Sequence, residues 1–293
     1  MRCIRVSPAR QLVYVACAAV LAAGCADEED DRPAREADTA AKPASTTAAS
    51  GEPDRVVKID GDRGLYIRCT GTGAPTVVME GGDGDTSDSY LFAERAVAKV
   101  TRACVYDRAN LGQSDPAPGP RGLPELVSDL ERLLETAKIA GPYVLVGTSG
   151  GGNITAGYAY EHPGDVAGLV FIDTGAPFPN PPKEIVEETD PSNPENVEKR
   201  DYLQVEKDAW NARTPIGDVP VKIVTAKFSP EAIKESPFPA ERELMRRNVK
   251  RQKGWLVLSP RAQQIVANTG HAVEEEDPQL VIDVILDAVK EAR

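Results

Sequence analysis

The chain has 293 residues, of which 46 are acidic and 34 are basic, so its formal net charge at pH 7 is -12. A surface this acidic repels the phosphate backbone of nucleic acids, which argues against a nucleic-acid-binding protein. A hydrophobic content of 41% is ordinary for a globular domain and argues against a fibre or a polytopic membrane protein.

Residues 1–25 have the three parts of an export signal. A start that contains three arginines precedes an apolar run from Leu12 to Ala23, which is shorter than the about 20 residues of a membrane-spanning helix. The ending LAAGC resembles a bacterial lipobox, although Ala22 stands where leucine is usual. We therefore predict an exported protein whose only membrane contact is an acyl anchor on Cys25. Plain signal cleavage, with Cys25 incidental, is the alternative.

Residues 26–54 are mostly Asp, Glu, Ala, Pro, Thr and Ser, with almost no large apolar side chain. Such a segment cannot bury enough surface to offset its ordering entropy, so it predicts a disordered tether. The folded domain is then predicted over residues 55–293. It retains two of the five cysteines, Cys69 and Cys104, which is enough for one disulfide in an exported protein.

Within the domain, short apolar runs alternate with helical patterns, which is typical of an α/β fold with a mostly parallel sheet. The helical patterns of Leu123–Ile139 and Pro278–Ala292 each carry an apolar stripe that is expected to cover the sheet. The eight predicted strands are Arg55–Ile59, Leu65–Cys69, Thr76–Glu80, Arg102–Tyr106, Tyr143–Gly147, Val166–Asp173, Val221–Ala226 and Gln263–Ala267.

A segment rich in Pro, Glu, Asp and Asn, at about residues 175–219, lies between the sixth and seventh predicted strands. Connections of this length are usually functional, so the segment predicts a lid over the functional site. A surface excursion without a role is the alternative.

The fifth predicted strand runs directly into the G-x-S-x-G pattern of residues 147–151, and a helical stretch follows it from Asn153 to Glu161. A strand, this tight turn and a helix form a nucleophile elbow, which exposes the serine hydroxyl at the carboxyl edge of the sheet. The positive end of the following helix favours negative charge there, and the amide of Gly150 can donate to an oxyanion. The pattern predicts Ser149 as a nucleophile.

A serine nucleophile needs a base, and the chain has only two histidines. His162 lies at the end of the helix after the elbow, where the chain turns on the far side of the sheet, and is expected to be a surface residue. His271 follows the last strand and precedes the final helix, in a loop that can reach the elbow. We therefore predict His271 as the general base.

The acid that orients the histidine is expected between the serine and the histidine along the chain. Asp173 ends the sixth strand at the same edge of the sheet, and Glu231 is the first acid after the seventh strand. We choose Asp173, with Glu231 as the alternative. A second oxyanion donor is expected from the glycine-rich loop after the third strand, at the backbone amide of Asp83 or, alternatively, Gly84. The acids of this loop lack a full calcium ligand set, so no metal and no cofactor are predicted.

The sequence YDRANLGQSD at residues 106–115 resembles the fourth-strand loop of the α/β-hydrolase superfamily, in its branch of small esterases and lipases. The elbow and Gly270-His271 match two further motifs, and the resemblance spans residues 55–291. It implies the α/β-hydrolase fold and a serine hydrolase that cleaves a carboxylic ester or related acyl bond of a small molecule. Two positions depart from the family pattern: Asp83 replaces an apolar residue, and the common acid after the seventh strand is absent.

The resemblance also implies a strand order in which the second strand lies beside the fourth. Cys69 ends the former and Cys104 lies in the latter, so a Cys69–Cys104 disulfide is expected. An acyltransferase that uses the same residues is an alternative function. A surface-anchored binding protein with weak catalysis is another, and its support is the acidic loop at Asp83.

Overall fold

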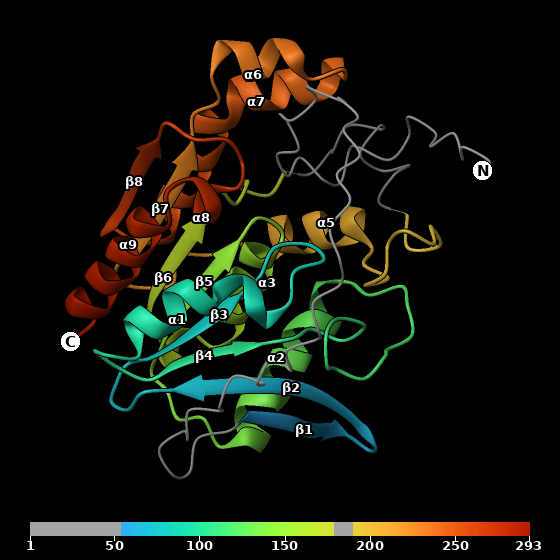
Figure 1. The fold of residues 1–293 in the computed structure, drawn as a ribbon, viewed down its shortest axis with the longest axis vertical. Coiled ribbons are helices and arrows are strands. Elements are labelled where there is room, and N and C mark those ends of the chain that lie inside the picture. Colours follow the sequence, from blue (N-terminus) through green and yellow to red (C-terminus); the bar gives the residue numbers. More distant parts are fainter. Residues whose placement is uncertain (1–53, 179–189) are drawn as a thin grey trace, which may run out of the picture.

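The computed structural model describes residues 54–178 and 190–293, so the predictions for the export signal, for Cys25 and for the tether up to residue 53 lie outside the described residues. One sheet in the order β1-β2-β4-β3-β5-β6-β7-β8 runs through the described part (Figure 1). The β1–β2 and β2–β4 pairs are antiparallel, and the other pairs are parallel. The strands are β1 (Asp54–Asp60), β2 (Arg63–Thr70), β3 (Thr76–Glu80), β4 (Ala103–Tyr106), β5 (Tyr143–Thr148), β6 (Val166–Ile172), β7 (Val221–Ala226) and β8 (Ala262–Ala267).

Helices cover both faces of this sheet, which confirms the predicted fold class. Helices α2 and α3 pack on one face, and α1 and α9 pack on the other (Figure 1). The main helices are α1 (Leu91–Val97), α2 (Leu123–Ala137), α3 (Gly151–Glu161), α5 (Tyr202–Ala212), α6 (Pro230–Glu235), α7 (Pro239–Gln252), α8 (Val273–Glu276) and α9 (Pro278–Glu291). Among the described residues, no helix is both long and apolar enough to cross a membrane.

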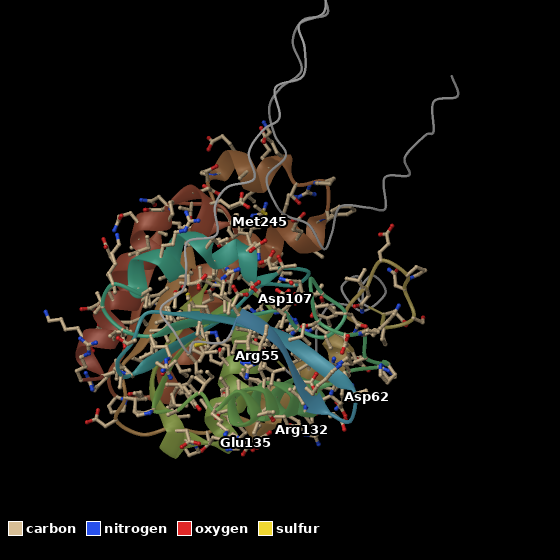
Figure 2. All side chains as sticks on the ribbon, turned by 60° about the horizontal axis from the view of Figure 1, so that its bottom comes forward. Arg55, Asp62, Asp107, Arg132, Glu135 and Met245 are labelled. Atoms are coloured by element: carbon tan, nitrogen blue, oxygen red, sulfur yellow. A yellow bond between two sulfur atoms is a disulfide. The ribbon has the colours of Figure 1, made fainter. Side chains whose placement is uncertain are left out.

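The central strands supply side chains to two separate cores. In β5, Leu145 faces the core beneath α2 and α3, whereas Val144 and Val146 face the core beneath α1 and α9. This alternation follows from the two-residue period of a strand, and burial on both faces explains why the strand is an unbroken apolar run. Other charged side chains lie on the surface, as Arg55 and Arg132 do, both of which are exposed (Figure 2).

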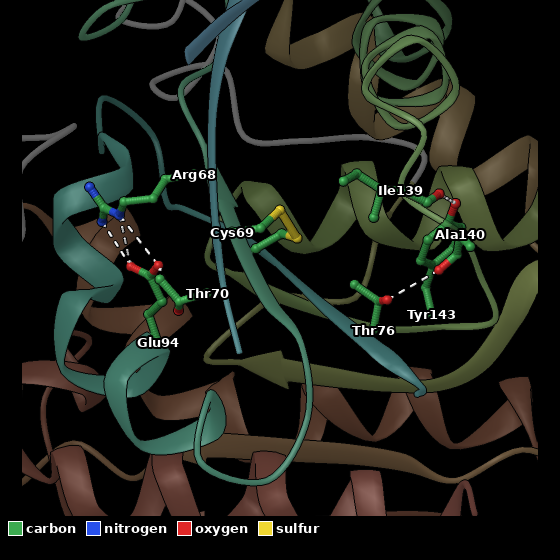
Figure 3. Close-up of a disulfide and its surroundings, with 9 residues drawn as sticks. Arg68, Cys69, Thr70, Thr76, Glu94, Ile139, Ala140 and Tyr143 are labelled. Atoms are coloured by element: carbon green, nitrogen blue, oxygen red, sulfur yellow. Dashed lines mark hydrogen bonds and ion pairs between the residues drawn. A yellow bond between two sulfur atoms is a disulfide. The ribbon is translucent and has the colours of Figure 1, made fainter. Parts of the chain in front are cut away.

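A disulfide joins Cys69 of β2 to Cys104 of β4, the pairing that the resemblance implied (Figure 3). The two residues are direct partners in the antiparallel ladder, with their Cα atoms 4.1 Å apart. Both are buried in the core beneath α2. The bond therefore ties the antiparallel edge of the sheet to its parallel centre.

We expect the double variant Cys69→Ala/Cys104→Ala to unfold with a free energy about 3 kcal/mol lower than the wild type, since the bond closes a loop between residues 35 positions apart. Urea denaturation measures this difference. Wild-type protein refolded with reduced cysteines is the matched control, because it loses the cross-link and keeps the packing. Equal stability of the oxidised and reduced wild type would contradict a stabilising cross-link.

Of the predicted lid, the structure describes residues 175–178 and 190–219. The second of these stretches contains α5. The side chains of Val205 and Ala209 on this helix are buried in the core that α2 and α3 cover. This part of the segment is thus packed onto the domain. The lid role stays a prediction, and residues 179–189 lie outside the described residues.

Candidate active site

The turn between β5 and α3 has the geometry of an elbow. Ser149 has a φ of 48°, a left-handed conformation that a residue with a side chain rarely adopts. Strand and helix approach closely here, because a Cβ atom on Gly147 would lie 2.5 Å from the Cα of Gly152. Glycine is therefore required at position 147, and the turn lifts the Ser149 side chain away from the sheet.

Ser149, His271 and Asp173 are brought together at the carboxyl edge of the sheet. The Oγ of Ser149 lies 2.9 Å from the Nε2 of His271, and the Nδ1 of His271 lies 2.6 Å from the Oδ2 of Asp173. Glu231, the alternative acid, is exposed in the first turn of α6. His162 ends α3 and lies 3.3 Å from Glu131 of α2. The arrangement links a hydroxyl, an imidazole and a carboxylate in one line.

The second oxygen of the Asp173 carboxylate accepts three hydrogen bonds. The donors to Oδ1 are the Asn248 side chain at 2.7 Å, the Gln252 side chain at 2.6 Å and the backbone amide of Ala226 at 2.9 Å. Asn248 and Gln252 lie four positions apart on α7, so both face the same way. Burial raises the pKa of Asp173, but its contact with His271 and its hydrogen bonds with Asn248 and the Ala226 amide lower it more, so the carboxyl group stays ionised.

Sequence reasoning missed Asn248 and Gln252. Their one local signal is two amides at helical spacing within an otherwise charged helix. That signal does not say that this face of α7 is buried, which both residues are.

The pKa of His271 lies above its ordinary value. Burial lowers this pKa, but the hydrogen bond to Asp173 and the nearby carboxylates of Asp173, Glu274 and Asp83 raise it more. A histidine acts as a general base only when it is neutral, so a raised pKa moves the onset of activity to higher pH.

We therefore expect kcat/KM for an ester to fall as the pH drops through a value above about 6.5, the pKa of an unperturbed histidine. The pH profile of kcat/KM for a neutral ester measures this value. An acid limb below pH 6 would contradict the raised pKa of His271.

The loop after β3 lies against the elbow. A Cβ atom on Gly82 would be 3.5 Å from the Cβ of Ser149. The Gly84 amide, the alternative oxyanion donor, donates to Glu198 Oε1 at 2.7 Å and is thus already engaged. The amide of Asp83 remains the proposed second donor beside Gly150.

Arg108 fixes the position of the loop after β3 through hydrogen bonds. The five N–H groups of its buried guanidinium donate to five oxygens. The acceptors are Glu80 Oε1 at 2.5 Å, the carbonyls of Gly81 at 2.7 Å and Gly82 at 2.6 Å, and the Glu198 carboxylate at 2.6 and 2.8 Å. Burial raises the pKa of Glu198, and Arg108 lowers it more. The loop is therefore fixed by charge-assisted hydrogen bonds, which are stronger than neutral ones.

Comparison with known proteins agrees with the fold. Residues 75–222 match the family model described as the alpha/beta hydrolase fold. The match covers about half of the chain, and the chain belongs to the alpha/beta hydrolase family.

Individual relatives are distant. A protein of Hormonema carpetanum that carries a transporter name is 34% identical over 129 residues, which are 41% of this chain and 18% of that protein. The chain thus spans less than a fifth of that relative. The enol-lactonase of Burkholderia xenovorans superposes with a TM-score of 0.58 at 17% identity, over 80% of this chain and 100% of the lactonase. An esterase of Thermogutta terrifontis superposes with a TM-score of 0.55 at 21% identity, over 81% of this chain and 98% of the esterase. At these identities the likeness concerns the fold.

Proposed function

We propose that this protein is a serine hydrolase that cleaves a carboxylic ester, or a related acyl bond, through an acyl-enzyme on Ser149. The observation that carries the proposal is the line from Ser149 through His271 to Asp173, with separations of 2.9 and 2.6 Å. An enol-lactonase and an esterase among the structural neighbours support the substrate class. An exported form anchored at Cys25 is part of the same proposal.

In the proposed reaction, His271 Nε2 takes the proton of Ser149 as Oγ attacks the carbonyl carbon. The carbonyl oxygen becomes an oxyanion beside the amides of Gly150 and Asp83. When the tetrahedral intermediate collapses, His271 gives its proton to the leaving alcohol, and the acyl group stays on Ser149. Water then attacks the acyl-enzyme, with His271 again as base, and releases the acid.

The nucleophile also argues against other chemistries of this fold. Dehalogenases and epoxide hydrolases that form an ester intermediate need a carboxylate nucleophile, and position 149 is a serine. An acyltransferase would use the same residues and differ only in the acceptor that attacks the acyl-enzyme.

A fluorophosphonate probe with mass spectrometry tests the proposal, combined with a series of p-nitrophenyl esters of increasing acyl length. We expect the probe to modify Ser149, and the labelling and hydrolysis to vanish in Ser149→Ala. The exposed Ser192→Ala is the matched control and is expected to behave as the wild type. Folded wild-type protein that neither labels nor hydrolyses any ester would refute the proposal.

A further inference from the structure

The residue after Ser149 is the unspecified position of the G-x-S-x-G pattern, and here it is a glycine. The Asp83 carboxylate takes the space that a side chain at this position would fill. A Cβ atom on Gly150 would lie 2.2 Å from Asp83 Oδ1 and 2.5 Å from Asp83 Oδ2. The carboxylate is therefore packed against the Cα of the residue whose amide is a proposed oxyanion donor.

A carboxylate in this position opposes the proposed reaction. Negative charge that develops on the substrate oxygen is repelled by a second negative charge nearby, and the repulsion is strong where water is excluded. Asp83 is also the departure from the family pattern at this site. Some other group has to offset its charge if an oxyanion is to form here.

The guanidinium of Arg200 is that group. It is paired with Asp83, and its Nη2 donates to the carbonyl oxygen of Gly150 at 3.0 Å. Arg200 is completely buried, although it lies just before α5 in the segment predicted as a lid. Burying a guanidinium is costly unless it is paired, so the contact with Asp83 is what makes this placement stable.

The chain segment that carries Arg200 contacts the loop after β3 at a second residue, Glu198. Glu198, two positions before Arg200, accepts from the Gly84 amide and pairs with Arg108. Glu198 and Arg200 thus hold the loop and the elbow in a fixed relation to one another. The position of the Arg200 charge is set by this anchoring and by the ring of Tyr202, 4.9 Å from the guanidinium carbon.

We infer that Arg200 is a positioning residue for the reaction of Ser149: it neutralises Asp83 and ties it to the Gly150 carbonyl, so that an oxyanion can form beside a carboxylate. The inference rests on the proposed function. Asp83 and Arg200 then act as a pair: the reaction requires the arginine because the aspartate is present.

A double-mutant cycle tests this unit, with kcat and KM measured on a short p-nitrophenyl ester. We expect Arg200→Met to lower kcat by about 100-fold, the scale of losing one oxyanion donor, with KM changed less than about threefold. Asp83→Asn keeps the backbone amide and should retain at least about a tenth of the wild-type kcat. The double variant Asp83→Asn/Arg200→Met should stay within about threefold of Asp83→Asn and be clearly faster than Arg200→Met.

The pH profile gives a readout that a purely structural role would not move. His271 faces the carboxylates of Asp173, Glu274 and Asp83. Without Arg200, the Asp83 charge is no longer offset and raises the pKa of His271 further. The acid limb of kcat/KM should therefore shift up by about 0.5 pH unit in Arg200→Met and return in the double variant.

The outcomes separate the two proposals. A wild type without turnover or probe labelling refutes the proposed function and this inference together. An active wild type with an Arg200→Met variant within about threefold of its kcat overturns the inference alone. A folded double variant as slow as Arg200→Met also overturns it, because Arg200 then acts independently of Asp83. Arg200→Gln, a neutral amide that can still donate to Asp83, replaces Arg200→Met if that variant does not fold, and the same loss and rescue are expected.

Discussion

Replacing His271 by alanine is expected to lower kcat for ester hydrolysis by about 10,000-fold, while His162→Ala leaves it within about twofold. His271 is the one histidine within hydrogen-bond distance of Ser149, at 2.9 Å. Without it, no group takes the proton of the hydroxyl during attack, and none gives a proton to the leaving alcohol. His162 lies at the other end of α3, against the ring of Tyr158.

His162→Ala is the matched control for His271→Ala, because the chain has only these two histidines and the substitution is the same. Steady-state kinetics on one ester, thermal unfolding and probe labelling of Ser149 should be measured for both variants. His271 is partly exposed on the loop after β8, so we expect His271→Ala to fold with little change in unfolding temperature. Equal activity of His271→Ala and the wild type would remove His271 from the proposed mechanism.

The fold was largely predictable from the sequence, because its central strands are buried on both faces and appear as short segments rich in apolar residues. β5 and β7 are buried along their whole length, and each was predicted within one residue of its bounds. The elbow was predictable for a related reason. Its strand, turn and helix are consecutive in the chain, so Ser149 and Gly150 carry a local pattern that needs no knowledge of tertiary contacts.

The groups that support the site could not be predicted in the same way. Asn248 and Gln252 reach Asp173 across 75 and 79 residues, and Arg200 reaches Asp83 across 117. Helix α7 is rich in charged residues, which indicates a solvated helix rather than one that buries two amides. The segment around Arg200 likewise has the composition of a surface loop. Only tertiary packing determines which polar side chains of such segments face the site.

Replacing Asp173 by asparagine is expected to lower kcat by about 1,000- to 10,000-fold. An asparagine can still accept at Oδ1 from Asn248, Gln252 and the Ala226 amide, so the variant should fold. Its amide nitrogen, however, donates toward Nδ1 of His271, where the aspartate accepts. This fixes the tautomer with the proton on Nε2, which then cannot take the proton of Ser149.

Glu231→Gln is the matched control, because it makes the same carboxylate-to-amide change at the alternative acid, which is exposed on α6. It should keep kcat within about twofold of the wild type, in line with other surface substitutions. The residual activity of Asp173→Asn adds a second measurement. The Asp173 carboxylate is the main group that raises the pKa of His271. Without it, the acid limb of kcat/KM in the variant should lie at lower pH than in the wild type. If Glu231→Gln were the slow variant and Asp173→Asn the fast one, the acid would act from α6 after a rearrangement of the loop that carries His271.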